Sequence, residues 1–310
     1  VGIVSLAAAG LLPILQGSLL GAFLLVATRI MTPRQAMEAV DMGVIFLIAG
    51  AFGIGAATAR AFAEQGCVLV LSDLNAAGRA QTSGRVLEAN AEHHSFTLDV
   101  SDEEQFNAVA EKVLADIGVP HILINNAGIG AHGSFLNTPM DAVRRVIDIN
   151  LYGVYNGCHA FLPMMLEGRD PRHLVNVASL ASISPVPNMS AYAASKYAVD
   201  GLTEVLAMEL ADSNVDVTCV HPGIINTPIA TGNSYNGDAG REQEQRLGEY
   251  YQAHGSDPAV VAKSMVGAVK TGIAHLYVGN KAPLTEKLKR LSPILMRKLA
   301  IKMAKQVGYA

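Results

Sequence analysis

A tyrosine and a lysine four positions apart, Tyr192 and Lys196, have the residue types and spacing best suited to catalysis in this sequence. On a helix, residues at this spacing lie one turn apart on the same face. A free tyrosine loses its proton only near pH ~10, and a fixed ammonium group nearby favours the phenolate and lowers that pKa. Ser179, thirteen residues before the tyrosine, adds a hydroxyl that can hold a substrate oxygen. Together they suit removal of a proton from an alcohol whose carbon gives up a hydride.

Apolar runs alternate with amphipathic stretches along the chain and predict the elements that position these residues. A helix is predicted over 56–65, ending at Gly66, and Ser101 with Glu104 predicts a capping box. Uninterrupted apolar runs are typical of strands buried on both faces of a parallel sheet. Their alternation with helices predicts a Rossmann-like doubly wound parallel sheet of the α/β class in a single domain. The predicted strands cover residues 44–48, 68–71, 95–98, 121–124, 173–177 and 215–220.

The composition allows one large core and gives no sign of a nucleic-acid partner. Half of the 310 residues are hydrophobic, 29 are glycine, and the net charge is −4. This amount of apolar sequence is ample for a single α/β domain, and a slightly acidic chain has no general attraction for nucleic acid. Cys67, Cys158 and Cys219 have the spacing of neither a zinc site nor a disulfide framework. We therefore expect no metal, and core cysteines in a reducing, cytoplasmic compartment.

The first 28 residues carry no charged side chain, and Arg29 is the first. Such a stretch is long enough to cross a bilayer as a helix, and Arg29 and Arg34 would then favour the cytoplasm for the rest of the chain. The segment can also be read as a gene-prediction artefact, because the chain starts with valine and Met42 stands just before the first predicted strand. Both interpretations of residues 1–41 stay open, and the catalytic domain is expected over 42–280.

Residues 281–310 form a basic segment with an amphipathic pattern. Eight lysines and arginines and one acid, Glu286, give it a charge of +7 in a chain of net charge −4, so the remaining residues carry −11. Leucines and isoleucines alternate with these cations. The pattern fits a helix on an anionic membrane surface, but we favour a solvated tail or a contact between subunits.

A glycine-containing turn, residues 49–55 (AGAFGIG), joins the first predicted strand to the first helix. Glycines here let a backbone approach a pyrophosphate at the helix N-terminus. Asp73 ends the second strand about 20 residues later, where an acid accepts hydrogen bonds from the adenosine ribose hydroxyls. A carboxylate there repels a 2′-phosphate, and Leu74 offers no compensating positive charge. The pattern therefore favours NAD over NADP, although Asp73 can also be an ordinary turn residue.

These features resemble the short-chain dehydrogenase/reductase family, in its NAD(P)-dependent branch of about 250 residues. The resemblance covers roughly Gly43 to Pro228, and the order and spacing of its landmarks make it specific. The landmarks are Gly53-Ile54-Gly55, Asp73, Asp99-Val100, Asn125-Asn126-Ala127-Gly128, Asn150, Ser179, Tyr192 with Lys196, and Pro222-Gly223 with Thr227.

The resemblance implies four catalytic roles. Tyr192 would be the acid/base, and Lys196 would bind the nicotinamide ribose and depress the pKa of the tyrosine. Ser179 would position the substrate oxygen. Asn150 would support a proton-relay water that reaches Lys196, although it can also cap or bend its helix.

The resemblance also implies a set of cofactor contacts. Glycine-turn residues would approach the pyrophosphate, Asp99 and Val100 would flank the adenine, and residues after the sixth strand would close over the nicotinamide. Asn125-Asn126 can also tie neighbouring strands together, and Thr227 can simply end a segment. The implied cofactor-binding residues are Gly50, Gly53, Ile54, Gly55, Asp73, Asp99, Val100, Asn126, Ala127, Gly128, Tyr192, Lys196, Pro222, Gly223, Ile225 and Thr227.

The glycine turn departs from the family pattern Thr-Gly-x-x-x-Gly-x-Gly. Either Gly50 is the first glycine and one residue is missing, or Ala49 takes its place. No threonine precedes it, and Phe52 stands where a small polar residue is usual. A bulky ring pressed toward the pyrophosphate would weaken cofactor binding, and a reading-frame error ending near Gly53 would explain the departure as well.

The function expected from these residues is NAD-dependent interconversion of a secondary alcohol and a ketone. One alternative is a non-catalytic binding or scaffold protein with an impaired cofactor turn. Another is a membrane-associated dehydrogenase for lipid, steroid or retinoid alcohols, attached through residues 1–28 or 281–310. The family resemblance also implies a homodimer or homotetramer.

The substrate itself is not specified by these motifs. Residues 129–133, 180–189 and the segment after Pro228 are expected to surround it, and they are mostly small and apolar, with His132 and Asn188 as polar exceptions. They fit a carbonyl compound of modest size and largely apolar character. The polar, glycine-rich stretch 231–240 is expected to be a mobile loop.

Overall fold

The computed structural model describes residues 43–48, 52–168, 170–230 and 237–307. Both interpretations of the N-terminal segment, the position of Gly50 and residues 231–236 of the expected loop lie outside the described residues. Residues 237–240, also expected in that loop, are instead the first turn of a helix. Among the helices that the structure describes, none combines the length and the apolar character needed to cross a membrane.

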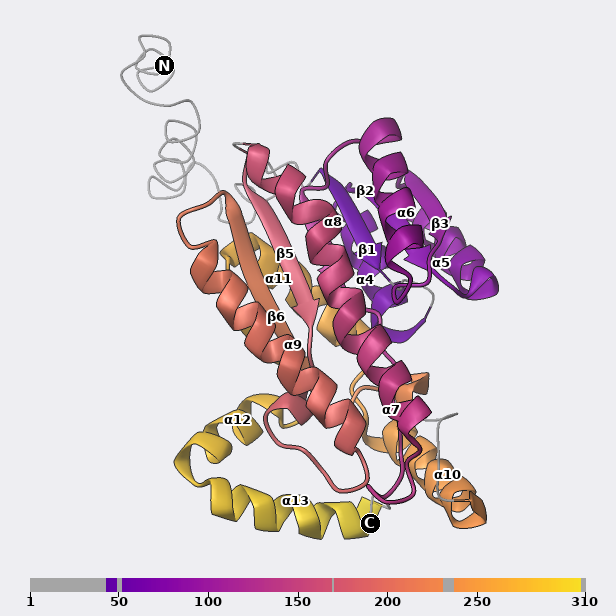
Figure 1. Cartoon of the computed structure of the whole chain (residues 1–310), viewed down its shortest axis with the longest axis vertical. Helices are drawn as coiled ribbons and strands as arrows, with labels where there is room; N and C mark the ends of the chain where they lie inside the picture. Colours follow the sequence, from indigo (N-terminus) through magenta and orange to yellow (C-terminus); the bar gives the residue numbers. More distant parts are fainter. Residues whose placement is uncertain (1–42, 49–51, 169, 231–236, 308–310) are drawn as a thin grey trace. The chain divides into compact units, whose positions relative to one another are not determined.

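Within the described residues, seven parallel strands form one sheet in the order β3-β2-β1-β4-β5-β6-β7. Figure 1 labels β1, β2, β3, β5 and β6 of this sheet. The predicted doubly wound fold is confirmed, and six strands coincide with predicted ones to within two residues at each end. The seventh strand, β7, was not predicted, because it is only four residues long and begins with the polar residue His275. The strands are β1 (Val44–Ile48), β2 (Val68–Asp73), β3 (His93–Thr97), β4 (Ile122–Asn125), β5 (Arg172–Val177), β6 (Val215–Pro222) and β7 (His275–Val278).

The order of strands reverses at β1, which pairs with β2 on one side and with β4 on the other. In open parallel sheets, the connections leave such a point in opposite directions and open a crevice beyond the carboxyl ends of the strands. The segments that follow β4, β5 and β6 therefore meet at one edge of the sheet. They carry most of the residues for which the sequence predicts chemistry.

Helices cover both faces of the sheet. On one face, α4 packs against both α5 and α11. On the other face, α6 packs against α8, and side chains of α6, α8 and α9 share one apolar core. These helices are α4 (Gly53–Ala63), α5 (Ala76–Glu88), α6 (Glu103–Asp116), α8 (Gly153–Glu167), α9 (Ser190–Glu209) and α11 (Pro258–Thr271).

The core between the sheet and α6, α8 and α9 holds these elements together. The rings of Phe106 and Phe161 meet edge to face at 6.5 Å, and both are fully buried. Burial of each such side chain contributes about 1.5–3 kcal/mol. Cys158 and Cys219 belong to this core, and all three cysteines are free and buried, as predicted.

The predicted capping box of α6 is wrong by one residue. Asp102, not Ser101, is the N-cap, and its carboxylate accepts a hydrogen bond from the Gln105 amide at 2.9 Å. The Ser101 hydroxyl donates instead to Asp99 at 2.6 Å. Because the Ser101 hydroxyl is bonded to Asp99, Ser101 does not cap the helix. The sequence pattern alone does not reveal this bond.

The basic C-terminal segment is not a solvated tail in the part that the structure describes. Residues 282–307 form the helices α12 (Ala282–Leu291) and α13 (Pro293–Val307), and α13 packs against α10 (Gly237–His254). Ala304 of α13 is buried in a cluster with Leu247 of α10 and Tyr192 of α9. The arrows of β5 and β6 in Figure 1 point toward α12 and α13.

Candidate active site

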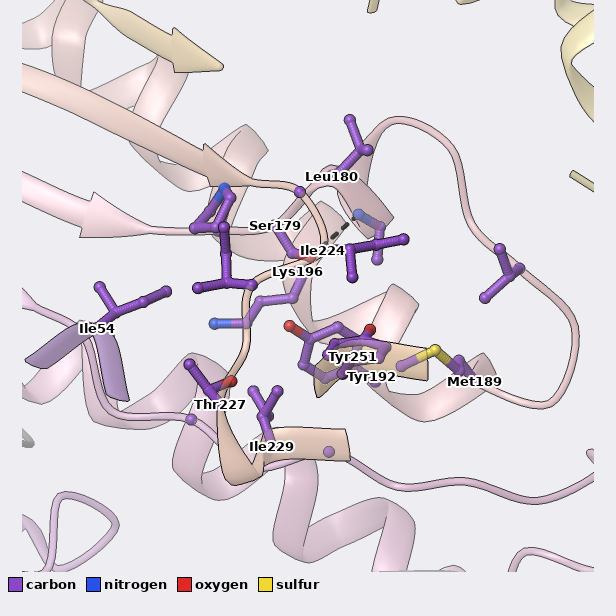
Figure 2. A pocket seen from close by; sticks show the side chains of 18 of the residues that line it. Ile54, Ser179, Leu180, Met189, Tyr192, Lys196, Ile224, Thr227, Ile229 and Tyr251 are labelled. Carbon is purple, nitrogen blue, oxygen red and sulfur yellow. Dashed lines mark hydrogen bonds between the residues drawn. The ribbon is translucent and has the colours of Figure 1, made fainter. Parts of the chain in front are cut away.

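Tyr192 and Lys196 lie in the first two turns of α9, as the spacing predicts, and both are buried. The Lys196 Nζ atom is 6.0 Å from the centroid of the tyrosine ring. Both residues line a cavity of about 430 Å³ at the carboxyl ends of the strands, and Figure 2 shows them side by side within it. Tyr192 and Lys196 are therefore cavity residues and not a pair of surface side chains.

Ser179 stands just after β5 and meets the tyrosine from the other side. Its hydroxyl lowers the pKa of the nearby Tyr192 phenol and accepts a hydrogen bond from the Ala181 amide at 3.1 Å. Its carbonyl accepts a hydrogen bond from the Ser182 hydroxyl at 2.7 Å. The serine is therefore oriented by its own short turn, Leu180–Ser182.

Lys196 ties α9 to the end of β5. Its amine donates a hydrogen bond to the Val177 carbonyl at 2.8 Å, across a buried contact. Burial lowers the pKa of Lys196 to about 8, because a desolvated ammonium is less stable than a hydrated one. This amine is therefore held close to the point at which it can exchange a proton near neutral pH.

The expectation that the lysine lowers the pKa of the tyrosine is not met in the protein alone. Burial raises the pKa of Tyr192 to about 12, although the nearby Ser179 hydroxyl lowers it and Tyr251 raises it further. Desolvation of a phenolate is costly, and the Lys196 amine donates its hydrogen bond to the Val177 carbonyl rather than to the phenol oxygen. The resting tyrosine is therefore a protonated phenol.

Asn150 lies behind the cavity wall, in a single π-helical turn (Asp148–Tyr152) between α7 (Met140–Ile147) and α8. Its side chain accepts from the Ile129 amide at 2.8 Å and donates to the Ile129 carbonyl at 3.0 Å. It also donates to the Ser195 hydroxyl at 3.0 Å. Through these hydrogen bonds, Asn150 joins the loop after β4 to α9.

Many of the predicted cofactor residues share this cavity. Gly53 has a φ of +55°, and a Cβ atom there would lie 2.8 Å from the Thr227 side chain. A Cβ on Gly128 would lie 3.3 Å from Lys196 Nζ and 3.4 Å from Asn150 Oδ1. Glycine at these positions therefore lets Thr227 approach Gly53, and Lys196 and Asn150 approach Gly128. The predicted cofactor residues in the lining are Gly53, Ile54, Asn126, Gly128, Tyr192, Lys196, Pro222, Gly223, Ile225 and Thr227.

Other predicted cofactor residues lie outside the cavity lining. Asp73 ends β2, and its carboxylate accepts from the Asn75 amide at 2.8 Å. Asp99 accepts from the Ser101 amide at 3.0 Å, and Val100 is buried in the main core together with the partly buried Ala127. Gly55 is buried within α4.

Asn125 and Asn126 have different surroundings, although the sequence offered one explanation for both. The Asn125 amide donates to the Asn176 side chain on β5 at 2.8 Å, so it ties neighbouring strands together. Asn176 in turn donates to Thr203 of α9 at 3.1 Å. Asn126 faces the cavity.

Phe52 lines the same cavity and is 48% exposed. It immediately precedes α4 and contributes no side-chain cap. The bulky ring of Phe52 is thus a half-exposed part of the cavity lining.

Sequence reasoning missed the residues that complete the cavity from the C-terminal third of the chain. Tyr250 and Tyr251 come from α10, and Met296 and Met303 come from α13. Met296, Ala300, Met303 and Ala304 follow the spacing of one helix face, which is the signal that could have placed α13 against the protein. The predicted substrate segments contribute His132, Leu180, Val186, Met189 and Ile229.

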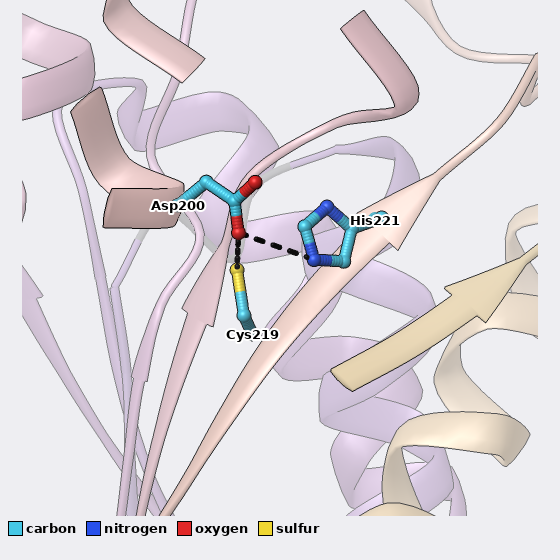
Figure 3. A group of neighbouring side chains, drawn as sticks. All are labelled: Asp200, Cys219 and His221. Carbon is cyan, nitrogen blue, oxygen red and sulfur yellow. Dashed lines mark hydrogen bonds and ion pairs between the residues drawn. The ribbon is translucent and has the colours of Figure 1, made fainter. Parts of the chain in front are cut away.

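A second cluster, of Asp200, Cys219 and His221, was also missed (Figure 3). Asp200 Oδ1 lies 3.5 Å from the Cys219 sulfur and 3.5 Å from His221 Nε2. His221 Nδ1 lies 3.1 Å from the hydroxyl of Ser182, which itself holds the Ser179 carbonyl. Asp200 comes from α9, so no spacing along β6 could have predicted the group.

The sheet, its switch point and the Ser–Tyr–Lys arrangement define a Rossmann-like α/β protein with a site suited to acid/base chemistry. A family model described as short chain dehydrogenase matches residues 43–236. The chain belongs to the short-chain dehydrogenase/reductase family, which is a family of oxidoreductases.

Named relatives agree with this assignment. EphD and SadH of Mycobacterium tuberculosis, both named as oxidoreductases, are 35% and 37% identical over 254 residues, or 80% of this chain. The match covers 43% of EphD and 91% of SadH, so the chain spans less than half the length of EphD. Estradiol 17-beta-dehydrogenase 11 of Mus musculus is 30% identical over 86% of this chain and 87% of its own length.

A solved structure shows the same fold. A short chain dehydrogenase/reductase from Burkholderia phymatum, crystallised in complex with NAD, is 28% identical to this chain. It superposes with a TM-score of 0.76 over 83% of this chain and 96% of its own.

Proposed function

We propose that this protein is an NAD-dependent oxidoreductase that interconverts a secondary alcohol and a ketone. The observation that carries the proposal is that Ser179, Tyr192 and Lys196 line one cavity, with the Ser179 hydroxyl close enough to the Tyr192 phenol to lower its pKa. A hydroxyl group of a substrate placed between serine and tyrosine has one partner that orients it and one that exchanges its proton.

Each residue then has one task. Tyr192 takes the hydroxyl proton in oxidation and returns it in reduction. Ser179 holds the substrate oxygen, and the Ala181 amide keeps that serine in place. Lys196 exchanges protons with the tyrosine region, and Asn150 fixes the loop and helix between which a relay water would stand.

The cavity residues suit a nicotinamide cofactor. When bound, the oxidised nicotinamide accepts the hydride from the substrate carbon, and its positive charge favours the phenolate. Gly53, Ile54 and Thr227 would hold one part of the cofactor, and Asn126 and Gly128 another. Asp73 at the end of β2 favours NAD over NADP, because its carboxylate repels a 2′-phosphate.

The substrate side of the cavity favours an apolar compound of modest size. Leu180, Val186, Met189 and Ile229 line it, together with Met296 and Met303 of α13. His132 and the hydroxyl of Tyr251 are the polar groups near the expected reaction centre. A relative named for estradiol supports an alcohol of this apolar character.

Cofactor titration followed by an alcohol screen tests the proposal. We expect NAD and NADH to bind the full chain more tightly than NADP and NADPH, and secondary alcohols to be oxidised with NAD. A protein that binds no nicotinamide nucleotide, or that binds NAD but turns over no alcohol or ketone in a broad panel, would contradict it.

A second candidate function is a binding protein of this family without catalysis. The observation that favours it is Phe52, whose half-exposed ring stands in the cavity mouth where the family has a small residue. If Phe52→Ser restores NAD binding that the wild-type chain lacks, this second function is the better one.

We also propose that the protein forms a homodimer or homotetramer and resides in the cytoplasm. Exposed apolar side chains on α8, α9 and the preceding turn support the association: Tyr152, Tyr155, Met164, Tyr197, Val205 and Met208. Light scattering coupled to size exclusion would give the molecular mass, and a monomer would refute the association.

A further inference from the structure

The helix α13 separates the cavity from the outside of the protein. Its inner face places Met296 and Met303 in the cavity lining and buries Ala300 and Ala304. These four positions recur at intervals of three and four residues, so they form one face of the helix. A compound that leaves the cavity on this side passes beside α13.

The outer face of α13 is unusually apolar for a protein surface. Leu291 at the turn between α12 and α13 is 82% exposed, and Ile294 is 71% exposed. Leu295, Leu299 and Ile301 are 49%, 42% and 43% exposed. Single exposed aliphatic residues are common, but five within three turns form a patch of the kind that marks an interaction site.

The same surface is positively charged. Arg297, Lys298, Lys302 and Lys305 are all exposed on α13, among the aliphatic side chains. The single acid of the segment, Glu286, is almost buried and forms an ion pair with Arg290. The described surface of residues 281–307 therefore combines aliphatic side chains and cations, with no exposed carboxylate.

We propose that the outer face of α13 (Leu291, Ile294, Leu295, Leu299 and Ile301 with Arg297, Lys298, Lys302 and Lys305) binds the surface of an anionic lipid bilayer. The aliphatic side chains enter the boundary between headgroups and acyl chains, and the long cationic side chains reach back to the lipid phosphates. The proposal rests on the proposed function, whose substrate it narrows to secondary alcohols or ketones that partition into lipid.

Charge selects the bilayer over a second copy of the chain as the occupant. A two-fold contact between two copies of this face would bring the same cations together, and like charges in an interface are costly. An anionic bilayer attracts them, at about 1 kcal/mol for each lysine or arginine near the surface. The rest of the chain carries a net charge of −11, so repulsion of that part orients α13 toward the lipid.

Vesicle flotation of the full chain tests the proposal without substrate or cofactor. The probes are vesicles of phosphatidylcholine alone and vesicles that contain phosphatidylglycerol as well. We expect binding to the anionic vesicles that weakens with added salt, and at least tenfold weaker binding to the neutral ones.

Three double variants locate the binding surface. Lys298→Gln with Lys302→Gln should lower the partition coefficient on anionic vesicles by at least about tenfold. Ile294→Ser with Leu295→Ser should lower it as well, at unchanged charge. The matched control is Arg85→Gln with Lys112→Gln, which removes the same charge from exposed positions of α5 and α6 and should change binding less than about twofold.

Several outcomes would overturn the proposal. Equal binding to neutral and anionic vesicles, unaffected by the α13 variants, would place any lipid contact elsewhere in the chain, residues 1–28 included. A loss as large in the Arg85/Lys112 control would show a general charge effect. A change of oligomeric state in the Ile294/Leu295 variant, with no vesicle binding by the wild type, would make the occupant a second copy.

A paired activity measurement separates this proposal from the proposed function. The Lys298/Lys302 variant should oxidise a short, water-soluble secondary alcohol at the wild-type rate and lose rate on a long-chain secondary alcohol held in anionic vesicles. Vesicle binding without any alcohol turnover would support the lipid-binding face of α13 and refute the proposed oxidation of alcohols. Equal loss on both alcohols would refute the role of α13 in access to lipid.

Discussion

The Lys196 amine lies 6.0 Å from the centre of the Tyr192 ring and gives its hydrogen bond to the Val177 carbonyl at 2.8 Å. The hydrogen bond of this lysine therefore goes to the backbone and not to the phenol oxygen. It joins the helix that carries Tyr192 to the end of the strand that precedes Ser179. This buried contact is one of those that fix the positions of the serine and the tyrosine relative to each other, together with the hydrogen bond from Asn176 of β5 to Thr203 of α9.

Replacement of Tyr192 by phenylalanine should remove the acid/base group and keep the shape of the cavity. We expect kcat to fall by about 10²–10⁴-fold, the usual contribution of a positioned proton donor or acceptor, with NAD affinity within about threefold of wild type. Steady-state kinetics and NAD titration measure the two effects. Tyr155→Phe, at an exposed position of α8, is the control, and undiminished turnover in Tyr192→Phe would end the proposed mechanism.

The rates of oxidation and reduction should respond to pH in opposite directions. Burial raises the pKa of Tyr192 to about 12, so the phenolate needed for oxidation becomes more abundant as pH rises. The phenol needed for reduction is abundant at neutral pH. We expect kcat/KM for oxidation to increase between about pH 6 and 10 while that for reduction stays level or falls.

The Lys196→Met variant is the matching test of charge. Loss of a nearby ammonium makes the phenolate less stable, so the rising limb of the oxidation profile should move to higher pH. A profile that is flat in the wild type, or that does not move in Lys196→Met, would show that another group governs the pH dependence.

The cofactor preference should depend on Asp73 and its neighbour. Asp73→Ser with Leu74→Arg removes the carboxylate and adds a cation at an exposed position, where a 2′-phosphate would lie. We expect the ratio of NADP to NAD affinity to rise by at least about tenfold, because one such charge contact contributes about 1.5–3 kcal/mol. Calorimetric titration of both nucleotides gives the ratio. An unchanged ratio would mean that Asp73 does not meet the ribose.

The size of the substrate should depend on α13. Met303→Trp places a larger side chain in the cavity lining and should lower kcat/KM for a bulky secondary alcohol by about tenfold or more, with a smaller effect on the smallest substrate. Leu299→Trp, on the outer face of the same helix, is the control in assays without lipid. Equal losses on large and small alcohols would indicate damage to the fold.

Stability should fall in mild acid because of His173 on β5. Burial lowers the pKa of this histidine from 6.5 to about 4. The Thr218 hydroxyl, 2.7 Å from its Nε2 atom, already donates to the Ile273 carbonyl, so the histidine is neutral and protonated at Nε2. In the unfolded chain this histidine binds a proton below pH ~6.5, whereas in the folded chain it stays neutral until the pH is about 4. The contribution of neutral His173 to the free energy of unfolding is therefore full above pH ~6.5 and is lost as pH falls toward 4.

The expected loss from this group between pH 7 and 4.5 is about 2.5 kcal/mol. Urea unfolding at the two pH values measures it, and His173→Gln should remove most of that difference. His254→Gln, at an exposed site of α10, is the control. The same acid sensitivity in His173→Gln and in the wild type would assign the loss to other groups.

The sequence by itself determined the sheet and the chemistry of the site. Short uninterrupted apolar runs favour strands buried on both faces, and their alternation with helices favours a doubly wound sheet. Tyr192 and Lys196 share a helix face because their spacing is local. Ser179, Asn126 and Gly128 reach the same cavity because each follows a parallel strand, and such strands end at one edge of the sheet.

Only the tertiary structure decided what depends on packing between distant segments. The short strand β7 forms because β6 offers it an edge, and Met296 and Met303 enter the cavity because α13 folds back over α10. The pKa of Tyr192 rises because burial outweighs a lysine that bonds elsewhere. Asp200 meets Cys219 and His221 only when α9 packs on β6. These relations join residues far apart in the chain, and no local pattern encodes the distance between them.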